Sequence, residues 1–323
     1  MTLYPLTFHP IFKERVWGGR NLERFYHKPL PPKVPIGESW EITDRSGDIS
    51  VIANGPLAGK DLHWLVQNHR AELLGHERGE KRFPLLIKIL DARETLSLQV
   101  HPPAHRAAEL NGEPKTEMWY VAHADPGAEL FVGLKRGVTR KHFEDKMRAG
   151  TVAECFHRIS VKDGDAMFLP SGRVHALGKG LVIFEVQQNS DTTFRVFDWN
   201  RVGLDGKPRD LHLDQSLASI DFNDFEPRLL SSGFSETGSV RKRPLVRDPL
   251  FSVEIEELAS NQTLPLPSGK ATVIALVNGQ TTVSDPTLDV VLEPGGFCLV
   301  PASLENAVIR SATPSRFLTI QPG

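Results

Sequence analysis

Residues 164–175 read GDAMFLPSGRVH and follow the pattern G-x5-P-x-G-x2-H. The pattern begins with a turn glycine, continues as a short apolar strand and ends in a Pro/Gly corner, after which His175 returns toward the sheet. Seven further short apolar segments, many rich in β-branched residues, are predicted strands: 49–53, 85–90, 97–100, 119–122, 181–186, 271–277 and 297–300, in addition to 166–169 inside the motif. Since 24 prolines and 26 glycines separate such segments, we expect a mainly β protein with many turns.

Helical patterns interrupt the strands in four places, at 60–74, 103–110, 139–156 and 210–222. The segment 226–247 is rich in serine, glycine and charge, and it has neither the helical nor the strand period. We therefore interpret it as a connection between two packed units. This predicts a first domain at 1–225, which contains the helical insertions, and a β-rich second domain at 248–323.

The second unit repeats part of the opening motif, since residues 295–306 read GGFCLVPASLEN. Gly295 and Pro301 keep the six-residue spacing, whereas Ser303 and Asn306 replace the glycine and the histidine. The first motif resembles the second conserved motif of the cupin superfamily, whose histidine ligates a metal inside a small barrel, although Lys179 stands where that motif has asparagine. The resemblance implies two cupin-type jelly-roll barrels, the second without a metal histidine. Ordinary strand and turn chemistry is the alternative explanation of the repeat.

The composition excludes several classes of function. The 323 residues carry a formal charge of −2, so no basic field is available to hold nucleic acid. The longest apolar runs, such as 271–277, are too short to span a bilayer, and the N-terminus lacks a targeting pattern. We expect a cytoplasmic protein without a membrane partner. Cys155 and Cys298 are too few and too far apart for a disulfide framework or a thiolate metal site, so a metal must use His, Asp, Glu or Gln.

A candidate metal site lies upstream of the motif. Ser97, Gln99 and His101 alternate along LSLQVHPP, so an extended strand presents all three on one face. Glu117 heads a strand that can pair beside the first. Together with His175, these residues supply two imidazoles and one carboxylate, with Gln99 as a possible fourth ligand. This set suits one Zn²⁺ in an open catalytic site, although the same ligands also bind Fe²⁺, Mn²⁺ or Co²⁺.

Six segments match a known family in its own order. They are VWGGR (16–20), IGESWEI (36–42), FPLLIKILDARETLSLQVHP (83–102), KTEMWY (115–120), PSGRVHAL (170–177) and EVQQNSDTTFRVFDW (185–199). These segments resemble the signatures of type I mannose-6-phosphate isomerase, in the short bacterial form. The resemblance implies reversible isomerisation of mannose 6-phosphate and fructose 6-phosphate, with zinc bound by His101, Glu117 and His175 and, in some members, by Gln99.

The resemblance also implies two catalytic residues, Arg195 and Lys88. A guanidinium between apolar neighbours needs an anionic partner if it points inward, but Arg195 can also be an edge-strand residue that points outward. Burial of the lone Lys88 amine in an apolar strand would favour its neutral, proton-accepting form. The alternative is that Lys88 reaches solvent or pairs with Asp91 or Glu94.

Further residues are expected to contact the phosphosugar substrate or to support the pocket. Arg201 is placed by the resemblance where longer members carry a second phosphate-binding cation, and core packing is an alternative role for Trp17 and Trp40. The expected substrate contacts are Ser97, Lys115, Glu185, Asp191, Arg201, Trp17 and Glu38. A monomer or a homodimer is compatible with the sequence. A non-catalytic sugar- or metal-binding cupin, or an isomerase of another phosphosugar, remains an alternative; Lys88 and Arg195 together favour catalysis.

Overall fold

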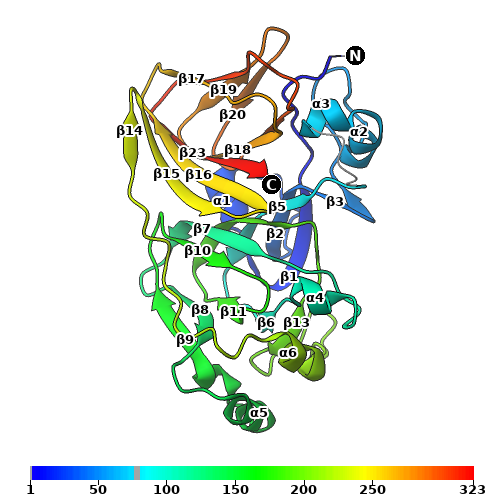
Figure 1. Cartoon of the computed structure of the whole chain (residues 1–323), viewed down its shortest axis with the longest axis vertical. Helices are drawn as coiled ribbons and strands as arrows, with labels where there is room; N and C mark the ends of the chain where they lie inside the picture. The colour runs from blue at the N-terminus through cyan, green and yellow to red at the C-terminus, as the bar shows by residue number, and fades with distance from the viewer. Residues whose placement is uncertain (1, 76–80) are drawn as a thin grey trace.

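The computed structural model describes residues 2–75 and 81–323, and it is mainly β, as the sequence predicted (Figure 1). The helices are short, the longest being α5 with nine residues. Within the described residues, no helix is long and apolar enough to cross a membrane. The α-helices are α1 (Asn21–Tyr26), α2 (Leu62–Asn68), α3 (Arg70–Leu74), α4 (Ala104–Ala107), α5 (Arg140–Arg148) and α6 (Leu213–Ser219).

Two sheets form the N-terminal part of the molecule. The six-stranded sheet has the order β1 (Ile11–Gly19), β2 (Ile36–Ile42), β5 (Leu85–Ala92), β12 (Leu181–Gln188), β7 (Glu117–Ala124) and β10 (Ala166–Leu169). The five-stranded sheet has the order β13 (Phe194–Phe197), β6 (Leu98–Val100), β11 (His175–Leu177), β8 (Glu129–Leu134) and β9 (Phe156–Ser160). A separate two-stranded ribbon pairs β3 (Asp44–Arg45) with β4 (Asp48–Ile49).

Two more sheets form the C-terminal part. The larger has the order β14 (Ser235–Thr237), β15 (Val240–Arg247), β16 (Phe251–Leu258), β23 (Ser315–Pro322), β18 (Thr272–Asn278) and β21 (Phe297–Val300). The smaller has the order β17 (Thr263–Pro265), β22 (Val308–Ser311), β19 (Thr281–Ser284) and β20 (Asp289–Leu292).

The strand order is the same in both parts. The sequence β5-β12-β7-β10 in the first corresponds to β16-β23-β18-β21 in the second, and β6-β11-β8-β9 corresponds to β17-β22-β19-β20. Eight strands arranged in two such sheets form a jelly roll. The repeated motif occupies the same place in each, because Gly164 (φ +87°) precedes β10 and Gly295 (φ +77°) precedes β21. Both glycines need this left-handed backbone to enter the strand.

The two barrels share one hydrophobic core. Residues of β5 and β12 in the first barrel and of β16, β18 and β23 in the second belong to the same buried cluster. The rings of Phe184 and Phe297 stack with centroids 5.6 Å apart, and Leu6 forms a β-bridge with Leu299. This packing buries one face of each large sheet, so the opposite faces are left to line the barrel interiors.

The structure differs from the sequence-based expectations in several places. The helices expected at 103–110 and 210–222 are shorter, at Ala104–Ala107 and Leu213–Ser219, and the strand expected at 49–53 is reduced to the end of β4 and isolated bridges at Val51 and Ile52. The segment 226–247, expected to be a connection, contains β14 and β15, which extend the C-terminal sheet. The helix expected at 139–156 stops at Arg148 because Gly150 adopts φ +70°, and a 3-10 turn (Val152–Cys155) then leads into β9. The strand that Glu117 heads does not pair beside β6, because β7 belongs to the opposite sheet. Glu117 therefore reaches the site from across the barrel.

Candidate active site

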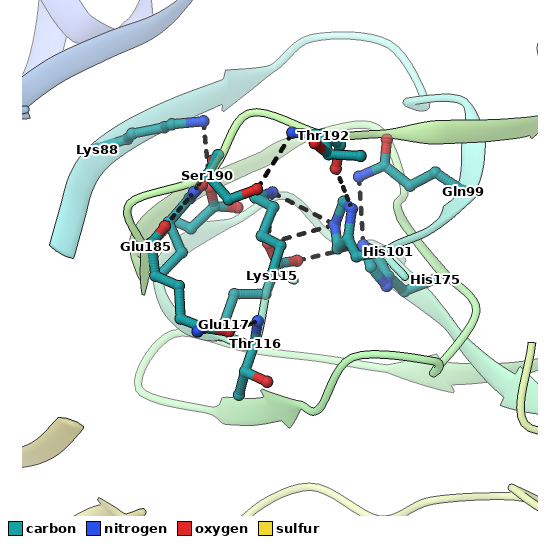
Figure 2. Close-up of polar contacts among 12 residues, drawn as sticks. Lys88, Gln99, His101, Lys115, Thr116, Glu117, His175, Glu185, Ser190 and Thr192 are labelled. Atoms are coloured by element: carbon teal, nitrogen blue, oxygen red, sulfur yellow. Dashed lines mark hydrogen bonds and ion pairs between the residues drawn. The ribbon is translucent and has the colours of Figure 1, made fainter. Parts of the chain in front are cut away.

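Three buried side chains meet inside the first barrel, where the two sheets face one another (Figure 2). His101 follows β6, His175 begins β11 and Glu117 begins β7. One nitrogen or oxygen from each residue lies within 4.8 Å of the other two, which is the arrangement of a metal site. His175 Nε2 lies 3.2 Å from Glu117 Oε1, and His101 Nε2 lies 3.5 Å from Glu117 Oε2. The structure thus brings together the three ligands predicted from the sequence.

Backbone carbonyls fix the orientation of both imidazole rings. His101 Nδ1 donates to Thr192 O at 2.8 Å, and His175 Nδ1 donates to Arg173 O at 2.9 Å. A carbonyl can only accept, so Nδ1 carries the proton and Nε2 turns its lone pair toward Glu117. Burial, reinforced by the nearby Lys115 ammonium, lowers the pKa of His101 to about 3, and burial also lowers the pKa of His175. Both rings are neutral at pH 7, as a metal ligand must be.

The Glu117 carboxylate is fully buried and ionised. Burial alone would raise its pKa, but the Lys115 ammonium and the two histidines hold that pKa well below its usual range. Lys115 Nζ lies 2.6 Å from Oε2, yet neither carboxylate oxygen accepts a well-directed hydrogen bond from any described residue. An anionic group buried in this way requires a further partner. A divalent cation between two imidazoles and a carboxylate satisfies it, and this donor set is typical of zinc.

Gln99 lies beside the triad, since its Nε2 is 3.2 Å from His175 Nε2. A half-turn of the amide would present the oxygen instead of the nitrogen to the same point. Ser97, two residues earlier, is buried and faces the same cavity. The alternation of Ser97, Gln99 and His101 on one face of the strand is therefore as the sequence predicted.

A cavity of about 570 Å³ lies beside the triad, because Gln99, which contacts His175, and Lys115, which contacts Glu117, both line its wall. Its wall includes seven of the other residues expected from the sequence, namely Trp17, Glu38, Lys88, Lys115, Glu185, Asp191 and Arg195. They come from β1, β2, β5, β12 and β13 and from the segments that precede β7 and β13. A cavity of this size and mixed polarity suits a small polar ligand.

Lys88 is buried between two carboxylates. Its Nζ lies 3.5 Å from Glu38 Oε2 and 3.5 Å from Glu185 Oε1, and 4.8 Å from the centroid of the Trp40 ring. Asp91, the alternative partner, instead accepts the Asn21 backbone N–H at 2.6 Å. The amine therefore points into the cavity.

The surroundings of Glu185 act on its pKa in opposite directions. Burial and the Glu117 carboxylate raise the pKa of Glu185, while the Lys115 and Lys88 ammoniums lower it, and the net direction is upward. Trp119 Nε1 donates to Oε2 at 2.8 Å. A buried carboxyl group with a raised pKa beside a lysine is a candidate for proton exchange with that lysine.

Arginines form one side of the cavity mouth. Arg195 donates to the Asp210 carbonyl at 2.7 Å and lines the cavity wall, so it does not simply point away from the protein. Arg201 does not line the wall, because Asp198 and the Thr95 carbonyl hold its guanidinium. Arg209 does line it, while its Nε donates to Asp198 Oδ2 at 2.6 Å.

Sequence reasoning missed Arg209, Arg15 and Thr192. Arg209 lines the cavity wall, whereas Arg201 does not. Arg15 lines the cavity and donates from Nε to Glu38 Oε1 at 2.7 Å. Lys13, Glu14 and Arg15 are consecutive in IFKERVW, so this segment lacks the apolar and polar alternation that could have identified Arg15 as a strand residue facing a cavity. Thr192 contributes only its backbone carbonyl, for which no sequence signal exists.

Trp17 and Trp40 have different surroundings. Both are buried, but only Trp17 lines the cavity wall. Trp40 donates from Nε1 to Glu38 Oε2 at 2.6 Å and thereby supports the wall from behind.

The chain is similar to known proteins along almost its entire length. The family description "Phosphomannose isomerase type I, catalytic domain" matches residues 6–116. The mannose-6-phosphate isomerase of Streptococcus mutans is 33% identical over 307 residues, which cover 94% of each chain. The crystal structure of the mannose 6-phosphate isomerase from Bacillus subtilis superimposes with a TM-score of 0.90 at 28% identity, over 98% of this chain and 99% of that one.

A zinc-bound crystal structure of a mannose 6-phosphate isomerase has the same fold, with a TM-score of 0.77 at 16% identity, over 98% of this chain and 99% of that one. Five of the six segments that resembled the family in sequence contribute residues to the cavity wall, and the sixth, 170–177, contains His175 of the triad. Sequence similarity, fold and site geometry agree, and the chain belongs to the type I mannose-6-phosphate isomerase family.

Proposed function

We propose that this protein is a zinc-dependent aldose–ketose isomerase that interconverts mannose 6-phosphate and fructose 6-phosphate. The observation that carries the proposal is the buried triad of His101, Glu117 and His175 beside a cavity whose wall includes Lys88 and Arg195. A site for metal binding alone has no need of a buried amine and a guanidinium in its wall.

The proposed metal ligands are His101, Glu117 and His175, with Gln99 as the fourth. A zinc ion held there polarises and positions substrate oxygens. Lys115 contacts Glu117, and the surrounding carboxylates keep its pKa above the usual lysine value despite its burial. Lys115 therefore remains an ammonium, and we assign it to hydrogen bonding with a substrate hydroxyl.

Isomerisation requires that a proton leaves C2 and that one returns to C1. We assign this transfer to Lys88, whose ammonium first passes a proton to the Glu185 carboxylate 3.5 Å away, so that the neutral amine can take the proton from C2 and return one to C1. Arg195 stabilises the negative charge that develops on the substrate oxygens. The proposed roles of Ser97, Glu38, Asp191 and Trp17 are to shape the wall and bind hydroxyls.

We assign the substrate phosphate to Arg209 rather than to Arg201. A dianionic phosphate needs a cation at the cavity wall, and the Arg201 guanidinium is engaged by Asp198 and the Thr95 carbonyl. Arg209 also contacts Asp198, but it remains part of the wall. Asp198 then acts as the group that holds Arg209 in place.

The setting of the reaction is also a proposal. The balanced charge favours a protein that binds small molecules without nucleic acid, working in the cytoplasm as a monomer or a homodimer. The domain limits at 1–225 and 248–323 stay predictions, with the reservation that β14 and β15 pair with the second barrel.

The decisive experiment measures conversion of mannose 6-phosphate to fructose 6-phosphate by the purified protein before chelation, after chelation and after zinc is restored. Activity that disappears with the metal and returns with zinc supports the proposal. A zinc-loaded, folded protein without turnover would contradict it, and parallel assays with other aldose phosphates would show whether the substrate alone was misassigned.

A further inference from the structure

The second barrel contains a cavity of its own, of about 540 Å³. It lies against β15, β16 and β23 and against the segment that precedes β18. The interior faces of β16 and β23 line it with Glu254, Glu256, Thr319 and Gln321. Their strand neighbours Val253, Leu318 and Ile320, by alternation, face the core shared by the two barrels.

Strand register shows that this cavity is the structural counterpart of the candidate active site. Leu169 and Val300 each lie five residues after the motif glycine and end equivalent strands. Leu169 lies opposite Glu117 on β7, and Val300 lies opposite Thr272 on β18. Thr272 thus occupies the position of the metal-binding carboxylate. The second barrel has a hydroxyl where the first has a zinc ligand.

The remaining polar positions correspond in the same way. Glu185 lies opposite Lys88 in the first barrel, and Thr319 lies opposite Glu254 in the second. A glutamate and a lysine of the active cavity are therefore replaced by a threonine and a glutamate. A further correspondence is Lys270, which precedes Thr272 by two residues as Lys115 precedes Glu117.

The floor of the second cavity offers hydrogen-bonding groups. Glu256 is 3% exposed; its Oε1 accepts from Thr319 Oγ1 at 2.8 Å. Its Oε2 lies 2.9 Å from Lys242 Nζ but accepts no well-directed hydrogen bond from any described residue. Gln321 Nε2 donates to Thr272 Oγ1 at 3.0 Å. The Thr319 hydroxyl, the Gln321 amide and the Glu256 carboxylate line the cavity together, and such groups bind sugar hydroxyls.

The wall carries no excess of either charge, because three cations face three carboxylates: Lys242, Arg247, Lys270, Asp248, Glu254 and Glu256. Two of the cations already form ion pairs, Lys242 with Glu256 at 2.9 Å and Arg247 with Glu254 at 3.2 Å. A phosphate dianion would find no concentration of positive charge here, and a metal ion would lack the histidines and the glutamate of the first barrel.

We propose that the cavity of the second barrel binds one small, uncharged polyhydroxylated molecule of monosaccharide size. The ligand hydroxyls donate to Glu256 and to the Thr319 oxygen, and they accept from the Gln321 amide. Binding here is separate from the isomerase reaction, so the proposal stands or falls independently of the proposed function.

The test uses mannitol, which has the hydroxyls of a hexose but no phosphate and no carbonyl to isomerise. Ligand-observed NMR titration of the zinc-loaded protein follows its binding with and without a saturating, equilibrated mixture of mannose 6-phosphate and fructose 6-phosphate. We expect saturable binding of one mannitol per chain that the phosphosugars do not displace. Absence of saturable binding, or displacement by the phosphosugars, would overturn the proposal.

Matched variants locate the site. Glu256→Gln removes the carboxylate charge at the cavity floor, and we expect about tenfold weaker mannitol binding. Glu257→Gln makes the same change on the adjacent residue of β16, whose carboxylate pairs with Arg316 outside the cavity, and should leave binding unchanged. Gln321→Ala is the second cavity variant, should Glu256→Gln fail to fold. Equal mannitol affinity in the cavity and control variants would refute the assignment.

Discussion

Glu38 is the buried carboxylate whose contribution to stability is most directly open to measurement. Trp40 Nε1 donates to it at 2.6 Å, Arg15 Nε donates at 2.7 Å, and Lys88 Nζ lies 3.5 Å away. Burial would raise the pKa of this carboxyl, but the charges of Lys88 and Arg15 and the hydrogen bonds from Trp40 and Arg15 lower it to about 2. Glu38 is not a proposed metal ligand, so its effect is separable from zinc binding.

The size of the stabilisation by Glu38 follows from the difference between its pKa in the folded protein and its pKa in the unfolded protein. A pKa of about 2 in the folded protein, against 4.5 for the unperturbed group, corresponds to about 3 kcal/mol of stabilisation at pH 7. Because the folded-state pKa is the lower one, this stabilisation is complete above the unfolded pKa and is lost as the pH falls through the folded pKa. At pH 3 about 1 kcal/mol should remain.

We predict that Glu38→Gln lowers the free energy of unfolding by up to about 3 kcal/mol at pH 7 and by about 1 kcal/mol at pH 3. Urea unfolding of the chelated proteins at both pH values measures this difference, and chelation removes the separate effect of acid on metal binding. Glu14→Gln, an exposed position on the neighbouring strand β1, is the control and should change stability by less than about 0.5 kcal/mol at either pH. A Glu38→Gln effect that is absent at pH 7, or equal at pH 7 and pH 3, would refute the reasoning.

Three further predictions address the site itself. His175→Ala should abolish stoichiometric zinc in metal analysis of the dialysed protein, and full zinc content would contradict the ligand assignment. Arg195→Ala should retain zinc but lower kcat/KM by about 10² or more, whereas wild-type kinetics would remove Arg195 from the mechanism. Arg209→Ala should raise KM for the phosphosugar at least about tenfold, while Arg201→Ala should affect KM less. The reverse ranking in steady-state kinetics would restore the phosphate to Arg201.

Turn residues at both ends explain why two strands could be predicted from the sequence. The strands 166–169 and 297–300 have the predicted limits because a turn glycine precedes each and a proline follows each. The turn chemistry acts within a few residues, so it is visible without the fold. The helix expected at 60–74 illustrates the opposite case, since it divides at His69 into α2 and α3 although the apolar spacing continues.

Strands with charged residues on one face were harder to recognise. β16 reads FSVEIEEL and alternates between apolar and polar positions, yet it was not among the predicted strands. Glu254 and Glu256 turn toward a polar cavity while Val253 and Ile255 enter the shared core. The alternation is visible in the sequence. The polar cavity that explains why one strand face carries glutamates forms only in the assembled barrel.

The candidate metal site was predictable because its ligands stand in distinctive local patterns. His101 and Gln99 share one strand face, and His175 ends the Pro/Gly corner. Arg209 has no such pattern. It reaches the cavity only because the chain after β13 folds back and Asp198 holds both Arg201 and Arg209, with Nη2 atoms 2.9 Å and 2.6 Å from Oδ1. A contact that depends on loop closure cannot be derived from spacing along the sequence.

The two barrels show how one strand order supports different chemistry. In each, the register places the same positions inside the cavity, whatever residues occupy them. In the first barrel, Glu117 and His175 fill two of these positions, and the buried charge they create requires a cation. In the second barrel, Thr272 takes the place of Glu117 in the strand register, and Asn306 takes the place of His175 in the repeated motif. These positions therefore offer no carboxylate and no imidazole to a metal ion. The absence of a metal histidine in the C-terminal motif thus accompanies the loss of the facing carboxylate, which leaves the second cavity suited to hydrogen bonding rather than to metal catalysis.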